Sequence, residues 1–416
     1  MQESLNLFPS GQALEALCAW SDNLKSFQQR IGKYFARSEA KGAAFDYIQA
    51  LLCPVERKNG WQMSEQVGYA NPYRFQHLLG RAQWDAEQVC VELRDYVVEH
   101  LDDAAGIVAI DETSFIKRGE ESVGVGRQYC GLTGQIENCQ VGVFLAYISS
   151  KGHSLLDRRL YLPKSWSAVP HRRKRAKVPS KVRFATKTGL AKRMLQSIFQ
   201  SGMRPAWFVA DEVYSRDAGF WRWLEQTARQ PYVLTVNKRQ PTPINFQTHY
   251  AEDLAQTIKP GDWHRLSSGA GTKTERDYDW ARIELSCRQP AGYSRWFLFR
   301  RCLEHRDDPR FISYYQVFAP SNTPLNTLVE VVGQRWRIEE CFQFAKDQLG
   351  LGDYEVRSWM GWHRHVTLVL AAQAFLSVLR YHVEPLPELS IPPFFSTPVA
   401  AGGLAVFRVA RGLSSA

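Results

Sequence analysis

The spacing of hydrophobic positions changes several times along the chain, and each change marks a different kind of structure. Up to about residue 100, apolar side chains recur every three or four residues, as in ALEALCAWSDNLKSFQQRIGKYF and VCVELRDYVVEHL. That period is typical of amphipathic helices. Asn71 and Pro72 predict a helix start, and Gly80 predicts a stop. The pattern therefore predicts a helical domain over residues 1–100.

A second pattern begins at Gly106, where short continuous apolar runs replace the helical spacing. The runs GIVAIDETSF, CQVGVFLAYISS, HSLLDRRLYLP, AWFVADEVY and YVLTVNK are typical of buried strands. Helical patterns at 187–201 and 217–229 lie between the later runs. Three strands followed by helix, strand, helix and strand predict an α/β core with a mixed sheet over residues 101–239.

The remaining third of the chain divides into three parts. Residues 240–322 alternate polar and apolar positions without a convincing helix, which predicts a β-rich insertion. Helical spacing returns in one long helix over 324–349, ended by Gly350, and in another over 360–382. We expect residues 323–383 to complete the core, and the Pro-rich, then Gly- and Ala-rich tail over 384–416 to have little order.

Composition narrows the function. The 416 residues carry 52 Lys and Arg against 42 Asp and Glu, a net charge of +10, which favours a polyanionic partner such as nucleic acid. No apolar run is long enough for a transmembrane helix. The start of the chain lacks the pattern of a signal peptide, and the eight cysteines lack zinc-site spacing. We therefore expect a cytoplasmic protein that does not contact membranes.

The densest basic segment is HRRKRAKVPSKVR, residues 171–183. It contains no acid and seven cations: Arg172, Arg173, Lys174, Arg175, Lys177, Lys181 and Arg183. Such a segment attracts phosphates in a salt-dependent way, although a solvated loop is the alternative. We predict DNA contacts here.

Two acids follow apolar strands of similar sequence. Asp111 ends GIVAID and Asp211 ends AWFVAD. Functional side chains of α/β sheets gather at the carboxyl ends of strands, although each Asp alone could be a turn former or a helix cap.

The predicted helix over 324–349 supplies a third candidate acid. Arg335, Glu339 and Lys346 share one face of this helix, where they would also suit an ordinary salt-bridged surface. Three carboxylates suit Mg²⁺, and two such ions can act on both sides of a phosphodiester.

These motifs together resemble a known family. IVAIDETSFIKRG with GRQYCG and ENCQVGVFLAY, then AWFVADEVY, then QRWRIEECFQFAKDQLG is similar to bacterial insertion-sequence transposases of the DDE superfamily, over residues of about 70 to 380. The resemblance implies a ribonuclease-H-like mixed-sheet catalytic core with a β-rich insertion, preceded by a helical DNA-binding domain. It also implies that Asp111, Asp211 and Glu339 are catalytic and bind two Mg²⁺ ions, with Mn²⁺ as a substitute.

The resemblance extends to DNA-binding residues, with one departure. It implies that Arg335 and Lys346 contact phosphates of the transposon end. Related transposases carry a Tyr three residues before this Arg, where this chain has Val332. In relatives with the insertion, an aromatic residue stacks on a flipped base. The candidates in this chain are Trp263, Trp280 and Trp296, and the alternative for each is packing within a strand. Of the three, we predict Trp296 as the DNA-binding residue.

The expected function is that of a cut-and-paste DNA transposase. It would bind terminal inverted repeats and perform metal-dependent strand cleavage and strand transfer on double-stranded transposon and target DNA. We expect a homodimer on DNA and a nucleoid-associated location in bacterial cytoplasm. The alternatives are a transposase-derived, non-catalytic DNA-binding regulator and, less favoured, a ribonuclease-H-like nuclease for RNA–DNA hybrids.

Overall fold

One large mixed sheet organises the protein. The computed structural model describes residues 11–244, 247–270 and 275–382. Within these residues ten strands join in one sheet, in the order β2-β3-β1-β5-β6-β12-β11-β10-β9, with β4 paired to the second half of β3. Their bounds are β1 (Ile107–Ile116), β2 (Gly126–Cys130), β3 (Gln135–Ser149), β4 (Gly152–Leu160), β5 (Trp207–Ala210), β6 (Tyr232–Val236), β9 (His264–Ala270), β10 (Glu275–Glu284), β11 (Tyr293–Arg301) and β12 (Ile312–Pro320).

The core half of this sheet has the predicted order. Strands β1, β3 and β4 form an antiparallel meander, and β5 and β6 then run parallel to β1. The first four residues of β1 and all of β5 are buried, because helices cover both faces of the sheet. The predicted fold class, a ribonuclease-H-like mixed α/β core, is confirmed.

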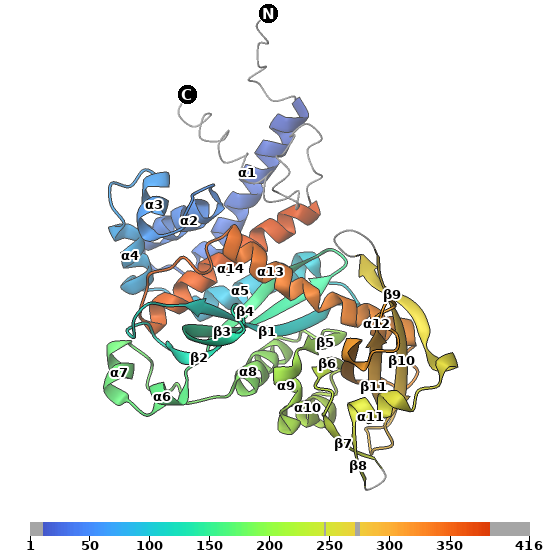
Figure 1. Ribbon diagram of the computed structural model, residues 1–416. Coiled ribbons are helices and arrows are strands. Elements are labelled where there is room, and N and C mark those ends of the chain that lie inside the picture. Colours follow the sequence, from blue (N-terminus) through green and yellow to red (C-terminus); the bar gives the residue numbers. More distant parts are fainter. Residues whose placement is uncertain (1–10, 245–246, 271–274, 383–416) are drawn as a thin grey trace, which may run out of the picture.

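Helices cover the two faces unequally (Figure 1). Helices α5 and α14 pack on β4, with α13 beside them, while α8 and α9 pack on β3, β5 and β6. Their bounds are α5 (Ala86–Leu101), α8 (Lys187–Gln200), α9 (Glu212–Ser215), α13 (Trp336–Asp347) and α14 (Trp359–His382), with the short helices α6 (Lys164–Ser167), α7 (Pro170–Arg175) and α10 (Ala218–Trp223).

The N-terminal helices are attached to the C-terminal helix α14. Arg364 of α14 is buried and donates hydrogen bonds to backbone carbonyls just after α4, including Ala82 O at 2.6 Å and Trp84 O at 2.8 Å. Tyr47 Oη lies 2.8 Å from His365 Nδ1. These contacts join the two ends of the described chain. The helices are α1 (Gly11–Gly32), α2 (Ser38–Leu52), α3 (Gly60–Gln66) and α4 (Tyr73–Gly80).

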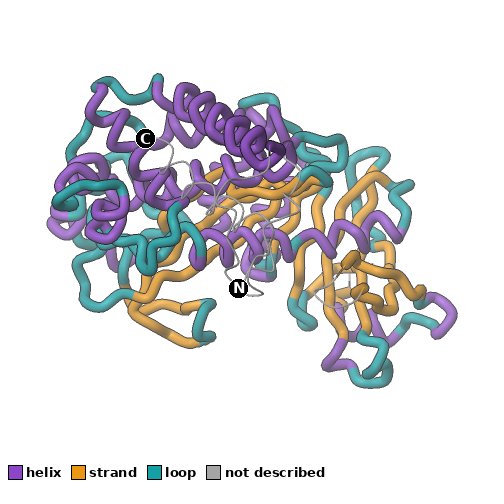
Figure 2. Tube along the Cα trace, turned by 90° about the horizontal axis from the view of Figure 1, so that it is seen from above, coloured by secondary structure: helices purple, strands orange, loops and turns teal. Residues whose placement is uncertain are grey.

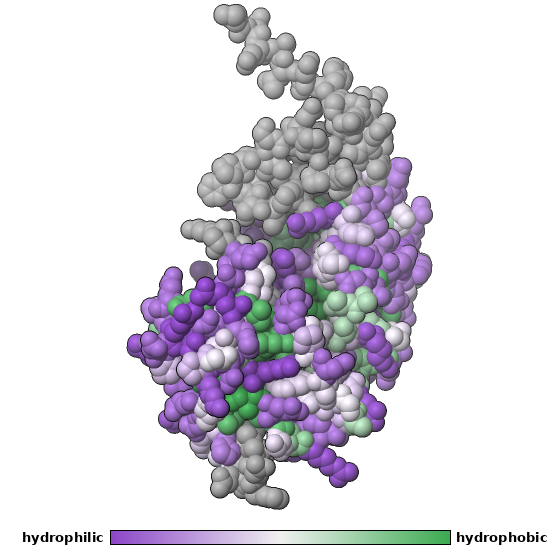
Figure 3. Space-filling view, turned by 90° about the vertical axis from the view of Figure 1, so that its right-hand side faces the viewer, coloured by the Kyte–Doolittle hydropathy of each residue, from purple (hydrophilic) through white to green (hydrophobic). Residues whose placement is uncertain are grey.

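The predicted β-rich insertion continues the core sheet. β12 pairs antiparallel with β6, and β11, β10 and β9 follow outward, so this part forms one side of the molecule in Figure 2. Its outer face is mostly hydrophilic, with small apolar patches (Figure 3). A hairpin of β7 (Pro241–Ile244) and β8 (Gln247–Tyr250) precedes a helix that the sequence did not predict, α11 (Ala251–Gln256).

The single long helix predicted over 324–349 is wrong, because the chain forms two helices there. One residue, Arg335, separates helix α12 (Leu325–Gln334) from α13. Gly333 O accepts a hydrogen bond from Arg276 Nη2 of β10 at 3.3 Å, and the Gly333 backbone packs directly against Ser268 O of β9. The insertion therefore packs directly against the end of α12, just before the interruption at Arg335. The predicted tail, 384–416, lies outside the described residues.

Candidate active site

The pairing of β1 with β5 brings the first two candidate acids together. These strands are parallel, and Ile110 pairs with Ala210. Asp211 follows the last residue of β5, as predicted, whereas Asp111 does not end its strand, because β1 continues to Ile116 along β3. The two acids therefore lie side by side at the point where β5 stops. Asp211 also caps α9, because its Oδ1 accepts a hydrogen bond from Val213 N at 2.9 Å. Asp211 is therefore a helix cap, which was the alternative to a functional role in the sequence analysis. Capping uses only Oδ1, so Oδ2 is still available to bind a metal ion.

A third carboxylate, Glu112, joins this pair. One oxygen from each of Asp111, Glu112 and Asp211 lies within 4.8 Å of the others. Glu112 pairs with Lys187 at the start of α8 and accepts a hydrogen bond from Tyr214 Oη at 3.1 Å. Glu112 is not among the site residues predicted from the sequence, although it directly follows Asp111. Across the described ranges, this is the only group of three or more His, Cys, Asp or Glu arranged to hold a metal ion.

The charges of this cluster are poorly compensated. Burial, together with the charges of Asp211 and Glu112, raises the pKa of Asp111 to about 8. Burial and the charge of Glu112 raise the pKa of Asp211 to about 6. Buried carboxylates that repel one another bind a cation readily, and carboxylate oxygens are the donors that hard divalent ions prefer. The residues present therefore fit a divalent metal.

Arg335 connects Glu339 to this cluster. At the start of α13 its Nη2 donates to Glu339 Oε1 at 2.9 Å, and its Nη1 lies 3.7 Å from Asp111 Oδ2. Glu339 thus shares a guanidinium with Asp111, but it lies outside the group of carboxylates arranged to hold a metal ion, which contains Glu112 instead. Lys346, two turns further along α13, donates to Thr113 Oγ1 on β1 at 2.6 Å. The helix face predicted from the sequence is the one that faces β1.

The predicted basic segment is partly helical and partly paired. Arg172, Arg173, Lys174 and Arg175 lie on α7, and Lys177 follows with a positive φ of 55°. Lys174 and Lys177 are exposed. The sequence showed no neighbouring acid, but Glu121 from the β1–β2 connection forms an ion pair with Arg175. Part of the positive charge is therefore neutralised locally.

The insertion tryptophans are mostly packing residues. Trp280 is fully buried and Trp296 is 3% exposed, with the Arg282 guanidinium over its ring. Neither offers a free face to a base in this structure, which favours the alternative of packing within a strand. Trp263 is partly exposed, but the guanidinium of Arg301 lies 4.2 Å from its ring centre.

Comparisons with known proteins match most of the chain. A family model described as DDE superfamily endonuclease matches residues 30–265, and one described as Transposase DDE domain matches residues 185–375. A probable transposase for insertion sequence element IS701 from Microchaete diplosiphon is 30% identical over 101 residues, which are 24% of this chain and 27% of that protein. The chain thus spans about a quarter of this curated relative.

A solved structure aligns with nearly the whole length of this chain. The cryo-EM structure of piggyBac transposase, in a synaptic complex with hairpin DNA, aligns with 97% of this chain and 82% of that chain, with a TM-score of 0.46 and 11% identity. None of the helices that the structure describes is long and apolar enough to cross a membrane.

Proposed function

We propose that this chain, which belongs to the DDE superfamily endonuclease family, is a transposase that binds terminal inverted repeats and performs strand cleavage and strand transfer. The family matches confirm the resemblance expected from the sequence. Together they span residues 30–375 and so include Asp111, Asp211 and Glu339. The observation that carries the proposal is the pairing of Asp111 with Asp211 in one carboxylate cluster, with Arg335 joining Asp111 to Glu339.

In this proposal the acids bind divalent metal, and Mg²⁺ is the expected ion with Mn²⁺ as a substitute. Bound metal would activate the attacking oxygen and stabilise the leaving oxygen of the phosphodiester. The protein's own part is to hold the carboxylates at one edge of β1 and β5. Arg335 orients Glu339 and adds a positive charge where the scissile phosphate would lie, and Lys346 adds a second one.

DNA outside the active site would lie along the basic surfaces. Exposed cations of the segment 171–183 support duplex binding through phosphate contacts. Two DNA ends must meet for strand transfer, so we propose that the protein acts as a homodimer on DNA. A cytoplasmic, nucleoid-associated location follows from this substrate.

The test is cleavage of duplexes that carry the inverted repeats flanking the gene, with Mg²⁺ or Mn²⁺. Asp111→Asn, Asp211→Asn and Glu339→Gln should each abolish cleavage. Glu340→Gln is the matched control, because Glu340 instead pairs with Arg337 at 2.7 Å. Cleavage that survives Asp111→Asn or Glu339→Gln would contradict the proposal. DNA binding without cleavage by the wild-type protein would favour the non-catalytic regulator.

A further inference from the structure

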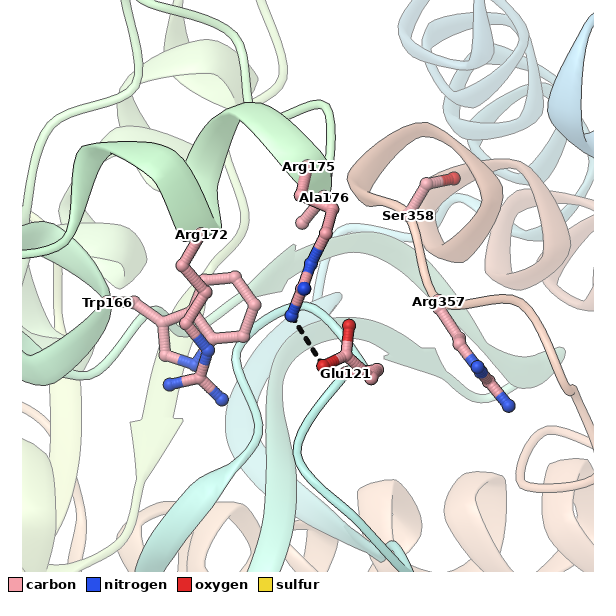
Figure 4. Close-up of a pocket in the computed structure, with 7 residues that line it drawn as sticks. All are labelled: Glu121, Trp166, Arg172, Arg175, Ala176, Arg357 and Ser358. Atoms are coloured by element: carbon pink, nitrogen blue, oxygen red, sulfur yellow. Dashed lines mark hydrogen bonds and ion pairs between the residues drawn. The ribbon is translucent and has the colours of Figure 1, made fainter.

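A cavity of about 220 Å³ lies beside α7. It is lined by Arg172 and Arg175 of α7, by Arg357 of the segment before α14 and by Glu121 of the β1–β2 connection. In Figure 4 Arg175 points toward Glu121, and Arg357 lies on the other side of Glu121 with its side chain directed away from α7. A water molecule occupies about 30 Å³ in the liquid, so the cavity holds a phosphate-sized anion with some water. Three guanidinium groups against one carboxylate make it electropositive.

Arg172 is held rigidly in this cavity. Its guanidinium lies 4.0 Å from the ring centre of Trp166, a fully buried side chain whose Nε1 donates to Val125 O at 2.7 Å. One of its own nitrogens, Nη2, donates to Glu120 O at 2.7 Å. Stacking and this hydrogen bond fix the orientation of the group, so little side-chain entropy is lost when the remaining N–H groups bind an anion.

The other two arginines are in different states. The Arg175 guanidinium is paired with the Glu121 carboxylate, whose side chain is about half exposed. Arg357 is exposed, and its side chain makes no hydrogen bond or ion pair with any residue that the structure describes. Its backbone is nevertheless anchored, because Arg357 O accepts a hydrogen bond from Val123 N at 2.9 Å. Of these two arginines, Arg357 is thus free to bind an anion, whereas Arg175 is already paired with the Glu121 carboxylate.

We propose that this cavity binds one backbone phosphate of DNA, and that the Glu121 carboxylate occupies Arg175 until the phosphate displaces it. Guanidinium groups bind carboxylates and phosphates with the same paired N–H geometry, so the two anions compete for the same donors. The identity of the anion as DNA rests on the proposed function. In this proposal Arg357 contacts the phosphate. Glu121 competes with the phosphate for Arg175 and so weakens DNA binding.

The test is the salt dependence of duplex binding, measured by fluorescence anisotropy of a labelled 30-bp duplex in EDTA, so that cleavage plays no part. Each phosphate contact contributes about 0.9 to the slope of log K against log salt. Arg357→Ala should therefore lower the slope by about one and weaken binding. Glu121→Gln should strengthen binding about three- to tenfold at moderate salt, because Arg175 no longer has to exchange partners.

Glu120→Gln is the matched control for Glu121→Gln. It removes the same charge from the adjacent residue, whose side chain does not line the cavity. Equal gains in the two variants would show a general charge effect and overturn the competitor role. An unchanged slope in Arg357→Ala, in a protein with wild-type circular dichroism and melting temperature, would overturn the phosphate contact.

Inorganic phosphate distinguishes the two sources of the anion. At constant ionic strength, added phosphate should weaken DNA binding by the wild type more than by Arg357→Ala. If phosphate raises the melting temperature through Arg357 while the DNA slope stays unchanged, the cavity binds free phosphate and the proposal fails. Wild-type cleavage of terminal-repeat DNA with an unchanged Arg357→Ala slope rejects this inference alone, whereas absence of any DNA binding rejects the proposed function as well.

Discussion

Arg335, the residue that precedes α13, lies one helical turn before Glu339 and shares a hydrogen bond of 2.9 Å with it, while the same guanidinium lies 3.7 Å from Asp111. Arg335, which the sequence predicts as a DNA-binding residue, thus contacts acids from two different elements. This arrangement makes it both an orienting group for Glu339 and a source of positive charge at the site.

We predict that Arg335→Met lowers the cleavage rate about 100-fold, the typical effect of removing one electrostatic donor from an active site. Arg335→Lys should recover part of this loss, because it keeps the charge but not the planar pair of donors. The measurement is the single-turnover rate on terminal-repeat DNA. Arg337→Met is the control, since Arg337 pairs with Glu340 instead, and an equal loss in that variant would point to helix damage.

A second prediction concerns pH. In the folded protein without metal, the pKa of Asp111 is raised to about 8, so the stability that its protonated form provides is complete below pH 4 and is lost as the pH rises toward 8. Asp111→Asn should therefore unfold at a higher temperature than the wild type at pH 8. At about 2 °C per kcal/mol in a large domain, we expect a shift of roughly 2–6 °C.

The difference should become small below about pH 3, because the wild-type carboxyl is then protonated in both the folded and the unfolded state. At pH 8, Mg²⁺ should raise the melting temperature of the wild type and have little effect on Asp111→Asn. Calorimetric scans in EDTA and in Mg²⁺ measure both effects. A wild type that is more stable than the variant at pH 8 in EDTA would contradict the repulsion described above.

The third prediction separates Glu112 from its partner. Glu112→Gln removes a carboxylate from the cluster and should weaken Mn²⁺ binding about tenfold, a common size for loss of a supporting group at a metal site. Lys187→Met should instead strengthen it, because the cluster loses a neutralising cation. Isothermal titration calorimetry measures both constants. Changes in the same direction would show that Glu112 acts only through its pairing with Lys187.

The fourth prediction concerns the break between α12 and α13. A Cβ on Gly333 would lie 2.0 Å from Ser268 O, a clash that the backbone must relieve. Gly333→Ala should lower the free energy of unfolding by about 1–3 kcal/mol, as overpacking does.

Gly42→Ala in α2 is its control, because a Cβ there meets nothing within 4 Å. That change should raise the free energy of unfolding by about 0.5–1 kcal/mol. Urea denaturation compares the two variants. A neutral Gly333→Ala would show that β9 does not press on the helix.

The sequence could predict what depends on local pattern. The apolar runs before Asp111 and Asp211 exist because the first part of β1 and all of β5 are buried. The run before Asp211 does mark the end of its strand, but β1 continues past Asp111 to Ile116. The four-residue spacing of Arg335 and Glu339 likewise survives the helix break. Each of these inferences needed only one segment of the chain.

What the sequence could not show depends on distant partners. Glu112 acquires its place from Lys187 and Tyr214, which lie 75 and 102 residues further along the chain. The helix break at Gly333 requires the backbone of β9, and the ion pair of Arg175 requires Glu121 across 54 residues. No periodicity within a segment carries that information.

The pairing of β6 with β12 has a consequence for synthesis of the protein. Tyr232 of β6 pairs with Phe318 of β12. About twenty per cent of the whole chain must therefore be synthesised after β6 before a strand can pair with its second edge. Until then a strand that is almost wholly buried in the finished fold presents open backbone groups to other chains. Truncations that end between these strands should therefore aggregate. Soluble expression of the intact protein should improve at low temperature, where fewer misfolded copies accumulate around the nascent chains.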